Sequence, residues 1–203
     1  MNKSQLLQSL KQKGFSDKIL NAFSKVPREN FIPKELKNQA YEDTALPIGK
    51  GQTISQPYTI ATMLQMLDLK PGEKALEIGS GCGYVLPLIS EITKSKVYGI
   101  EIIKELAEKS RQNLKDYKNI KIYNKNGASG LEEYAPYNKI IISAAIKDIP
   151  KIILNQLKDN GSIVAPVGSD YGQDLVAIQR KNNSFIEKQR IPGFVFVPFI
   201  EKE

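Results

Sequence analysis

The chain has 203 residues, a length that suits one domain with a proper hydrophobic core. Its single cysteine excludes an internal disulfide and suggests a reducing compartment, and the absence of histidine excludes Ser-His-Asp catalysis, Cys-His catalysis and histidine metal sites. The net charge of +7 comes from lysines scattered along the chain, which favours an evenly solvated surface over a nucleic-acid-binding face.

The first part of the chain predicts two short helices. Apolar residues recur at helical spacing in two stripes, Leu6, Leu7 and Leu10 and then Ile19, Leu20 and Phe23. Gly14 separates the stripes, and two prolines predict an extended segment over residues 26–33. This region could be a lid or a packing extension. No apolar run resembles a signal peptide or reaches membrane-spanning length, so we expect a soluble, cytoplasmic protein.

Residues 41–57 are rich in turn formers and hydroxyl groups but show little periodicity, which predicts a loop with short strands. Pro57 is suited to the first turn of a helix expected over residues 58–69. Ser55 therefore stands at a helix N-terminus, where its hydroxyl and nearby backbone amides could bind an anion. Alternatively, Ser55 or Gln56 could simply cap the helix.

Residues 74–84 form the most informative stretch, a short apolar strand that runs into a glycine-dense turn. Gly79, Gly81 and Gly83 allow positive φ and a close approach of the backbone to a ligand. The pattern G-x-G-x-G differs from the dinucleotide pattern G-x-G-x-x-G, and no Gly-Lys-Ser/Thr follows, which excludes a P-loop. The turn predicts a nucleotide-like ligand at the carboxyl edge of a parallel sheet.

Glu101 ends the next apolar strand, where a carboxylate can accept both hydroxyl protons of a ribose and repels a 2′-phosphate. Adenosine without a phosphate at the turn indicates S-adenosylmethionine. Glu77, inside the glycine motif, could order the turn or meet the ammonium group of the ligand. The acidic strand end argues against the alternative of a glycine-rich turn with no ligand. Cys82 could be a reactive thiol, but without histidine we interpret it as a packing residue.

The rest of the chain alternates helix-like and strand-like segments. We expect helices over residues 84–92, 104–117 and 150–157, and strands over 96–101, 120–123, 139–143, 162–167, 174–179 and 194–199. Gly161 is expected to end the last helix, and residues 181–184 to form a polar turn. Small residues after Ser143 leave room for a ligand, and Asn126 stands where an adenine edge could be read. The alternation predicts an α/β fold with antiparallel C-terminal strands.

Two segments together carry a family resemblance. Residues 51–57, Gly-Gln-Thr-Ile-Ser-Gln-Pro, and residues 76–84, Leu-Glu-Ile-Gly-Ser-Gly-Cys-Gly-Tyr, resemble the protein-L-isoaspartate O-methyltransferase family. Shorter matches at residues 26–31, 41–43, 135–137, 143–145, 156–158, 166–168 and 196–198 extend the resemblance over nearly the whole chain. It implies a Rossmann-like class I methyltransferase sheet with an N-terminal helical extension. The single domain would comprise residues 1–57, with the helices and the substrate-side loop, and residues 58–203, the cofactor-binding core.

The resemblance implies an enzyme that moves a methyl group from S-adenosylmethionine to the free α-carboxylate of L-isoaspartyl residues in damaged proteins. The ester then collapses to a succinimide, whose hydrolysis returns some normal aspartate. The substrates would be isoaspartyl proteins and peptides, and we expect a monomer with no nucleic-acid or membrane partner and no metal. A carboxylate acceptor is already ionised at pH 7, which agrees with a chain that has no histidine to act as a base.

The same resemblance assigns the site residues. Ser55 is the position expected to be essential, and Thr53, Ile54 and Val197 would lie near the acceptor peptide. The cofactor contacts would be made by Glu77, Gly79, Ser80, Gly81, Gly83, Glu101, Ile102, Asn126 and Gly127.

The chain departs from the family at residues 125–127, which read Lys-Asn-Gly where the family usually has Gly-Asp-Gly. Asn126 can still accept a hydrogen bond from the adenine amino group, but without charge assistance, so we expect weaker cofactor binding rather than lost function. The alternatives are a methyltransferase that acts on RNA or a small molecule, and a cofactor-binding paralogue with reduced activity. A nicotinamide oxidoreductase is a third reading, against which the glycine spacing counts.

Overall fold

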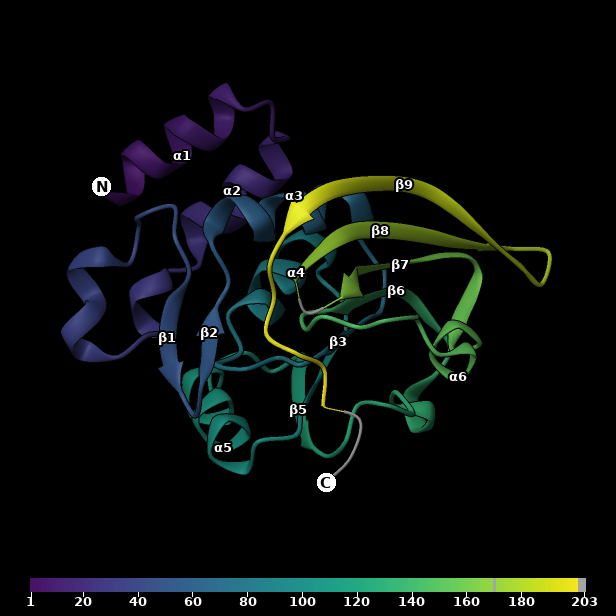
Figure 1. Cartoon of the computed structure of the whole chain (residues 1–203). Helices are drawn as coiled ribbons and strands as arrows, with labels where there is room; N and C mark the ends of the chain where they lie inside the picture. Colours follow the sequence, from purple (N-terminus) through teal and green to yellow (C-terminus); the bar gives the residue numbers. More distant parts are fainter. Residues whose placement is uncertain (170, 201–203) are drawn as a thin grey trace.

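A seven-stranded sheet runs through the structure, a computed structural model that describes residues 1–169 and 171–200 (Figure 1). The strand order is β5-β4-β3-β6-β7-β8-β9, with the first five strands parallel and the last two antiparallel. The strands are β3 (Ala75–Ile78), β4 (Val97–Glu101), β5 (Ile120–Asn124), β6 (Tyr137–Ile142), β7 (Leu157–Ser169), β8 (Gly172–Lys181) and β9 (Ser184–Phe194). The predicted α/β fold with antiparallel C-terminal strands is therefore confirmed.

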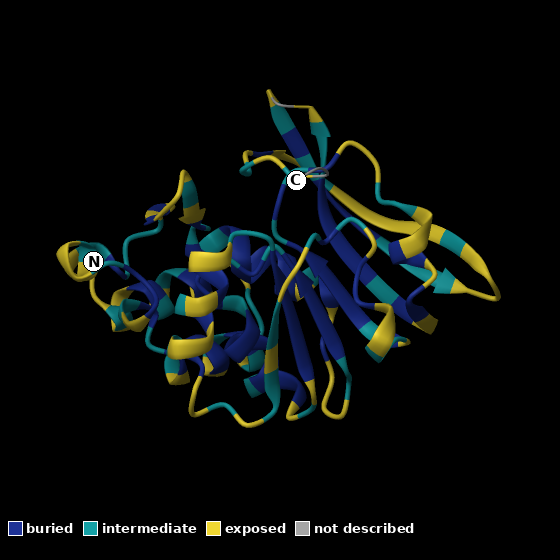
Figure 2. Ribbon diagram, turned by 90° about the horizontal axis from the view of Figure 1, so that it is seen from below, coloured by how far each residue is buried: buried dark blue, intermediate teal, exposed yellow. Residues whose placement is uncertain are grey.

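The buried apolar residues form two clusters, so the central strands β3 and β4 are buried along their whole length, whereas the edge strand β5 keeps exposed residues. The helices are α1 (Lys3–Gln12), α2 (Asp17–Lys25), α3 (Pro57–Leu67), α4 (Val85–Thr93), α5 (Lys104–Asn113) and α6 (Lys151–Leu154). Short 3-10 turns lie at Arg28–Asn30, Lys34–Gln39 and Glu132–Tyr134. Figure 2 shows the buried strands at the centre, while exposed residues follow the outer faces of the helices and β9.

The two predicted N-terminal helices are confirmed and join the core. Asn2 caps α1 by accepting from the Gln5 backbone N–H, and Gly14 turns the chain toward α2 with a φ of +85°. Ile19 and Phe23 of α2 are buried, and α2 packs on α4, the helix that follows the glycine turn. The N-terminal region is thus continuous with the main core.

The predicted helix over residues 150–157 is only one turn long, because the chain pairs with β6 from Leu157 onward. The Tyr137 backbone N–H donates to the Gln156 carbonyl at 2.8 Å and starts this pairing. Gly161 ends no helix. It lies inside β7, where a Cβ would come within 3.0 Å of the Asn138 carbonyl oxygen. Strand pairing therefore overrides the helical spacing.

The C-terminal prediction was right about the turn and wrong about the following strand. Asn182 and Asn183, both at positive φ, join β8 to β9, but β9 ends at Phe194 rather than beginning there. Residues 195–200, here called the C-terminal segment, run beside the end of β6 as an irregular strap (Figure 1). Two backbone hydrogen bonds join Ala145 to this segment. The Ala145 N–H donates to the Val197 carbonyl, and the Ala145 carbonyl accepts from the Phe199 N–H, each at 2.8 Å.

The segment predicted as extended around Pro27 also differs, because residues 28–30 form a 3-10 turn. The loop over residues 41–57 is as predicted, with a small hairpin of β1 (Leu46–Gly49) and β2 (Gln52–Ile54).

No helix in the described part of the chain is long and apolar enough to cross a membrane.

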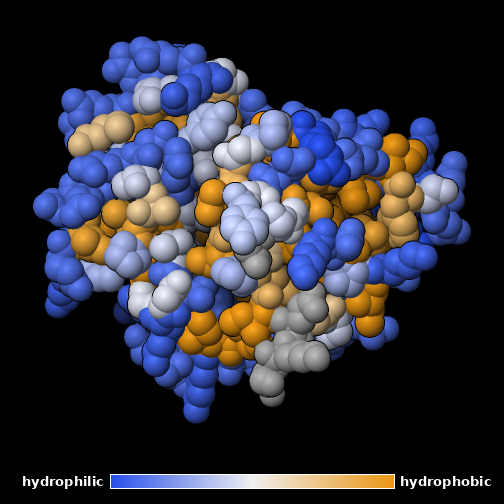
Figure 3. Space-filling model, viewed as in Figure 1, coloured by the Kyte–Doolittle hydropathy of each residue, from blue (hydrophilic) through white to orange (hydrophobic). Residues whose placement is uncertain are grey.

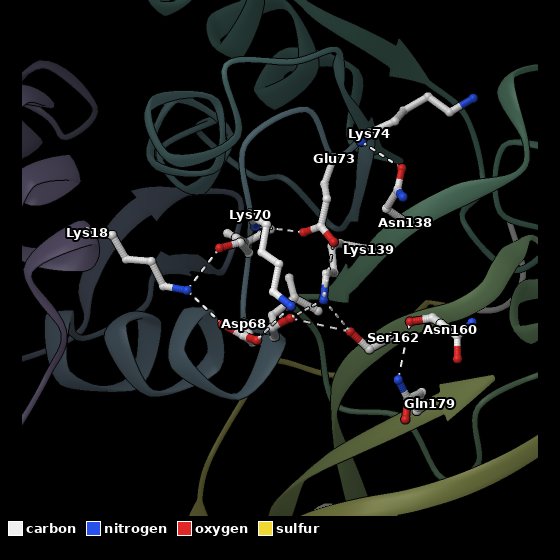
Figure 4. A network of polar contacts seen from close by, with 12 residues as sticks. Lys18, Asp68, Lys70, Glu73, Lys74, Asn138, Lys139, Asn160, Ser162 and Gln179 are labelled. Atoms are coloured by element: carbon white, nitrogen blue, oxygen red, sulfur yellow. Dashed lines mark hydrogen bonds and ion pairs between the residues drawn. The ribbon is translucent and has the colours of Figure 1, made fainter. Parts of the chain in front are cut away.

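A buried lysine joins three elements at the amino ends of the parallel strands (Figure 4). The Lys139 side chain of β6 is 7% exposed, and burial lowers its pKa. Its ammonium group donates to the Leu67 carbonyl at 2.7 Å and to the Ser162 hydroxyl at 3.1 Å. The carboxylate of Glu73 lies 3.8 Å away. Lys139 therefore satisfies the end of α3 while tying it to β6 and β7.

We expect Lys139→Ala to lower the free energy of unfolding by about 2 kcal/mol, because the Leu67 carbonyl loses its 2.7 Å donor and keeps only the Ser162 hydroxyl at 3.4 Å. Urea unfolding followed by circular dichroism measures the change. The matched control is Lys70→Ala, whose exposed side chain lies in the same network and should cost less than about 0.5 kcal/mol. Equal losses from the two variants would show that the buried contacts of Lys139 contribute nothing.

Candidate active site

The carboxyl ends of β3, β4 and β6 border a hollow of about 560 Å³, here called the large cleft. It is lined by Gln52, Thr53, Ile78, Gly79, Gly81, Ile100, Glu101, Ile102, Ile103, Gly127, Ser143, Ala144, Val197, Pro198, Phe199 and Ile200. In Figure 3 apolar and weakly polar side chains gather on this face between the β1–β2 hairpin and the C-terminal segment, with hydrophilic side chains around them.

Two smaller hollows adjoin the large cleft. The inner hollow, about 330 Å³, is lined by Thr53, Ile54, Ser55, Ile60, Glu77, Gly79, Ser80, Gly81, Cys82, Tyr84, Val85 and Ser143. The outer hollow, about 380 Å³, is lined by Ala45, Thr53, Ser55, Gln56, Thr59, Ser143, Val195, Phe196 and Val197. Thr53 and Ser143 line all three, so the hollows meet at these two residues, and Ser55 lies in the wall of the inner and outer ones.

The glycine turn forms the floor of the large cleft. After β3 the backbone N–H groups of Gly79 and Ser80 both donate to the Ile100 carbonyl at 2.9 Å, and the glycines at 79, 81 and 83 all have positive φ. Gly79 and Gly81 line the cleft. Gly83 instead faces α5, where a Cβ would come 2.3 Å from the Ser110 hydroxyl oxygen, so it allows close helix packing.

Glu101 fixes the turn from the neighbouring strand. One of its carboxylate oxygens accepts from the Gly81 backbone N–H at 2.7 Å and the other from the Ile103 N–H at 2.8 Å. Burial raises the pKa of this carboxyl, while the backbone donors oppose the rise. The carboxylate is thereby held at the edge of the large cleft, where the sequence predicted a partner for two hydroxyl groups.

Glu77 is the most deeply buried acid of the site, at 1% exposure. Its Oε1 atom accepts from the Ser143 hydroxyl at 2.7 Å, and its Oε2 atom is buried without a hydrogen-bond partner among the described residues. Burial raises the pKa of Glu77 to about 8, and the nearby charge of Glu101 adds to the rise. The unsatisfied oxygen marks a place for a hydrogen-bond donor from a ligand.

Ser55 lies just before α3, and the structure decides between the two roles that its sequence position allowed. The Asp43 carboxylate accepts from the Tyr58 backbone N–H at 2.8 Å, and neither Ser55 nor Gln56 caps the helix with its side chain. The Ser55 hydroxyl forms no hydrogen bond within the part of the chain that the structure describes. It is therefore available to a ligand in either of the smaller hollows.

The other predicted residues fall into two groups. Thr53, Ile102, Gly127 and Val197 line the large cleft, and Ile54 and Ser80 line the inner hollow. The side chain of Asn126 lines none of the three hollows, and its Oδ1 atom accepts from the Ala128 N–H at 2.8 Å. Gly127 is needed beside it, because a Cβ there would come 2.4 Å from a methyl group of Ile78.

Sequence reasoning missed the partner of Glu77 and most of the C-terminal wall. It valued Ser143 only for its small size, although the register of β3 with β6 places Ser143 directly beyond the pair Ile78–Ile142. Val195, Phe196, Pro198 and Phe199 were part of an expected strand rather than a site, and Ile200 was assigned to neither. No group of three histidine, cysteine or acidic residues able to hold a metal ion occurs among the described residues.

The raised pKa of Glu77 predicts a pH-dependent stability. The unfolded carboxyl ionises near 4.5, whereas the folded one keeps its proton to about pH 8, so the folded state binds more protons and stability falls as pH rises between these values. Glu77→Gln should make this fall shallower, by a few kcal/mol over the whole interval. Urea unfolding at pH 5, 6.5 and 8 measures it. Glu108→Gln, an exposed glutamate on α5, should leave the wild-type fall unchanged. An equally steep fall in Glu77→Gln would contradict the assignment.

Comparisons with known proteins agree on one family. The family model described as protein-L-isoaspartate(D-aspartate) O-methyltransferase matches residues 1–203. A relative from Methanothrix thermoacetophila, named protein-L-isoaspartate O-methyltransferase, is 43% identical over 206 aligned positions that cover 100% of this chain and 96% of the relative. A relative of the same name from Methanococcus aeolicus is 46% identical over 188 positions, covering 91% and 86%.

Two solved structures extend the comparison to the fold. One is a putative protein-L-isoaspartate O-methyltransferase from Plasmodium falciparum in complex with S-adenosyl-L-homocysteine. It has a TM-score of 0.87 and 31% sequence identity, and the match covers 100% of both chains. Another protein-L-isoaspartate O-methyltransferase structure gives a TM-score of 0.88 at 26% identity, with 97% of this chain and 65% of that longer chain covered.

Proposed function

The chain belongs to the protein-L-isoaspartate(D-aspartate) O-methyltransferase family, and from this premise we propose how its site methylates the free α-carboxylate of L-isoaspartyl residues. The activity depends on S-adenosylmethionine and begins the repair of damaged proteins. The observation that carries the proposal is the position of the Ser55 hydroxyl, unpaired within the described chain, where the inner and outer hollows share a wall.

The residues of the large cleft and inner hollow fit S-adenosylmethionine. The buried, unpartnered oxygen of Glu77 suits an ammonium donor, whose positive charge would favour the ionised form of this acid, and Glu101, held by two backbone donors, suits the ribose hydroxyl groups. Gly79 and Gly81 have positive φ and no side chain, so the main chain can approach the ligand closely at these two positions. When bound, this cofactor supplies an electrophilic methyl group on a sulfonium.

The acceptor enters through the outer hollow, whose rim carries Val195 at 80% exposure. The Ser55 hydroxyl donates to one oxygen of the isoaspartyl carboxylate and leaves the other free to attack. This acceptor is ionised at neutral pH, so the chain needs no general base, which agrees with its lack of histidine. Holding donor and acceptor in line can supply ~7–11 kcal/mol of the barrier reduction.

Isoaspartyl proteins are thus the substrates. We infer in addition that the chain works as one domain and as a monomer in the cytoplasm, without a nucleic-acid partner. The N-terminal region supports the single domain, because α1 and α2 share the main hydrophobic core with α3 and α4.

We expect Ser55→Ala to lower turnover on an isoaspartyl peptide about 100-fold, as is typical when one aligned hydrogen-bond donor to a reacting group is lost. Transfer of labelled methyl groups to the peptide and to its normal aspartyl twin measures it. Affinity for S-adenosylhomocysteine should stay the same. Ser24→Ala, whose side chain lines none of the three hollows, is the matched control. Wild-type turnover in Ser55→Ala would remove the proposed role, and methylation of RNA instead of the peptide would remove the function.

We expect Asn126→Asp to bind S-adenosylhomocysteine about tenfold more tightly, because a carboxylate is a stronger acceptor for the adenine amino group. One carboxylate oxygen can keep the hydrogen bond to the Ala128 N–H. Calorimetry with both proteins measures the gain. The gain should vanish with the inosine analogue of the ligand, which lacks the amino group. If Asn126→Asp also binds the inosine analogue more tightly than the wild type does, the side chain at position 126 does not contact the adenine amino group.

A further inference from the structure

Arg28 is a charged residue at 0% exposure that the mechanism so far does not use. It lies in the 3-10 turn that follows α2, where the sequence predicted an extended segment. Its Nη2 atom lies 3.4 Å from the Thr44 carbonyl oxygen and 3.5 Å from the Ile54 carbonyl oxygen. Its guanidinium carbon lies 5.2 Å from the centre of the Tyr84 ring.

These contacts leave the charge of Arg28 largely uncompensated. Its Nε and Nη1 atoms are buried without a hydrogen-bond partner, and no carboxylate of the described residues lies within 4 Å of it. The one acid of the described chain whose charge acts on Arg28 from a distance, Asp43, accepts from the Tyr58 N–H instead. A guanidinium keeps its charge even when burial lowers its pKa, so the protein holds a buried, unpaired cation.

The cation lies behind the wall of the inner hollow. Ile54 and Tyr84 both line that hollow, and both contact Arg28 from the other side. The Ile54 carbonyl that Arg28 contacts belongs to the same peptide group as the Ser55 N–H. None of the residues that line the inner or outer hollow is a lysine or an arginine. A carboxylate at Ser55 would therefore meet no cation in the wall itself.

We propose that Arg28 is a positioning residue that selects an ionised carboxylate as the acceptor, its charge acting through the Ile54–Ser55 peptide group and across the wall. The inference rests on the proposed function. A charge buried in protein is poorly screened by water, so it favours an anion that binds nearby. The acids and the cation then lie at different walls: Glu77 and Glu101 line the hollows of the cationic cofactor, and Arg28 lies behind Ile54, next to Ser55, which also lines the hollow of the anionic acceptor.

The test measures binding of an isoaspartyl peptide in the presence of S-adenosylhomocysteine by calorimetry. Arg28→Met, an apolar replacement of similar length, should raise the dissociation constant at least about tenfold, and Arg28→Lys, which keeps the charge, should stay within about threefold of wild type. Both variants should bind S-adenosylhomocysteine as the wild type does. A second peptide carries an amide in place of the α-carboxylate, and its weak binding should be the same in Arg28→Met and wild type.

Equal weakening of both peptides in Arg28→Met, or wild-type affinity for the isoaspartyl peptide, would overturn the role of Arg28. If the wild type does not methylate the isoaspartyl peptide at all, the proposed function fails and this inference fails with it. If the wild type methylates the isoaspartyl peptide and Arg28→Met binds this peptide normally, only the inference about Arg28 fails.

Because Arg28→Met could fail to fold, a measurement on the wild-type protein stands beside it. The Nε–H resonance of Arg28, identified with ¹⁵N-arginine labelling and the Arg28→Lys spectrum, should move when the isoaspartyl peptide is added with S-adenosylhomocysteine. The amide peptide should leave it in place. A resonance that ignores both peptides, or responds equally to both, would contradict the proposal.

Discussion

The carboxylate of Glu101 is the interaction on which the rest of the site depends. Its two oxygens accept from the backbone N–H groups of Gly81 and Ile103, and so they join the glycine turn to the end of the neighbouring strand. The turn has positive φ at three glycines, and Glu101 acts together with the Ile100 carbonyl to hold it in place. Held in this way, the turn sets the floor of the large cleft and places Tyr84, the residue before α4, in the wall of the inner hollow.

Buried charge organises the chemistry around that floor. Two acids face the large cleft and the inner hollow, and burial raises the pKa of both. The positive charge of Arg28 lies on the opposite side of the inner wall, behind Ser55. A reaction between a cationic donor and an anionic acceptor loses charge as it proceeds, so the protein mainly has to bind two opposite charges side by side and align them. Histidine has no necessary part in such a reaction.

The C-terminal segment connects the two halves of the site. Val197 lines both the large cleft and the outer hollow, and the Ala145 backbone anchors it at the end of β6. The Gln173 side chain fastens the same segment from β8, accepting from the Phe196 N–H at 2.8 Å and donating to the Ser169 carbonyl at 2.6 Å. A shift of this segment would therefore change the cofactor side and the acceptor side together.

The sequence alone determined those features that depend on neighbouring residues. The glycine spacing and the apolar strands predicted the turn and the α/β sheet, and the acidic end of the next strand predicted a ribose partner, because each is a property of a few consecutive residues. Pro57, which is suited to the first turn of a helix, predicted that Ser55 stands at a helix start.

Only the tertiary structure decided what Ser55 and its surroundings can do. The cap on α3 comes from Asp43, which left the Ser55 hydroxyl available, and the register of β3 with β6 paired Ser143 with Glu77. Strand pairing from Leu157 overrode a helical pattern, and packing around Arg28 produced a buried charge that no spacing rule indicates. Hydrogen bonding, burial and electrostatics act between residues far apart in the chain, so their outcome depends on the folded arrangement.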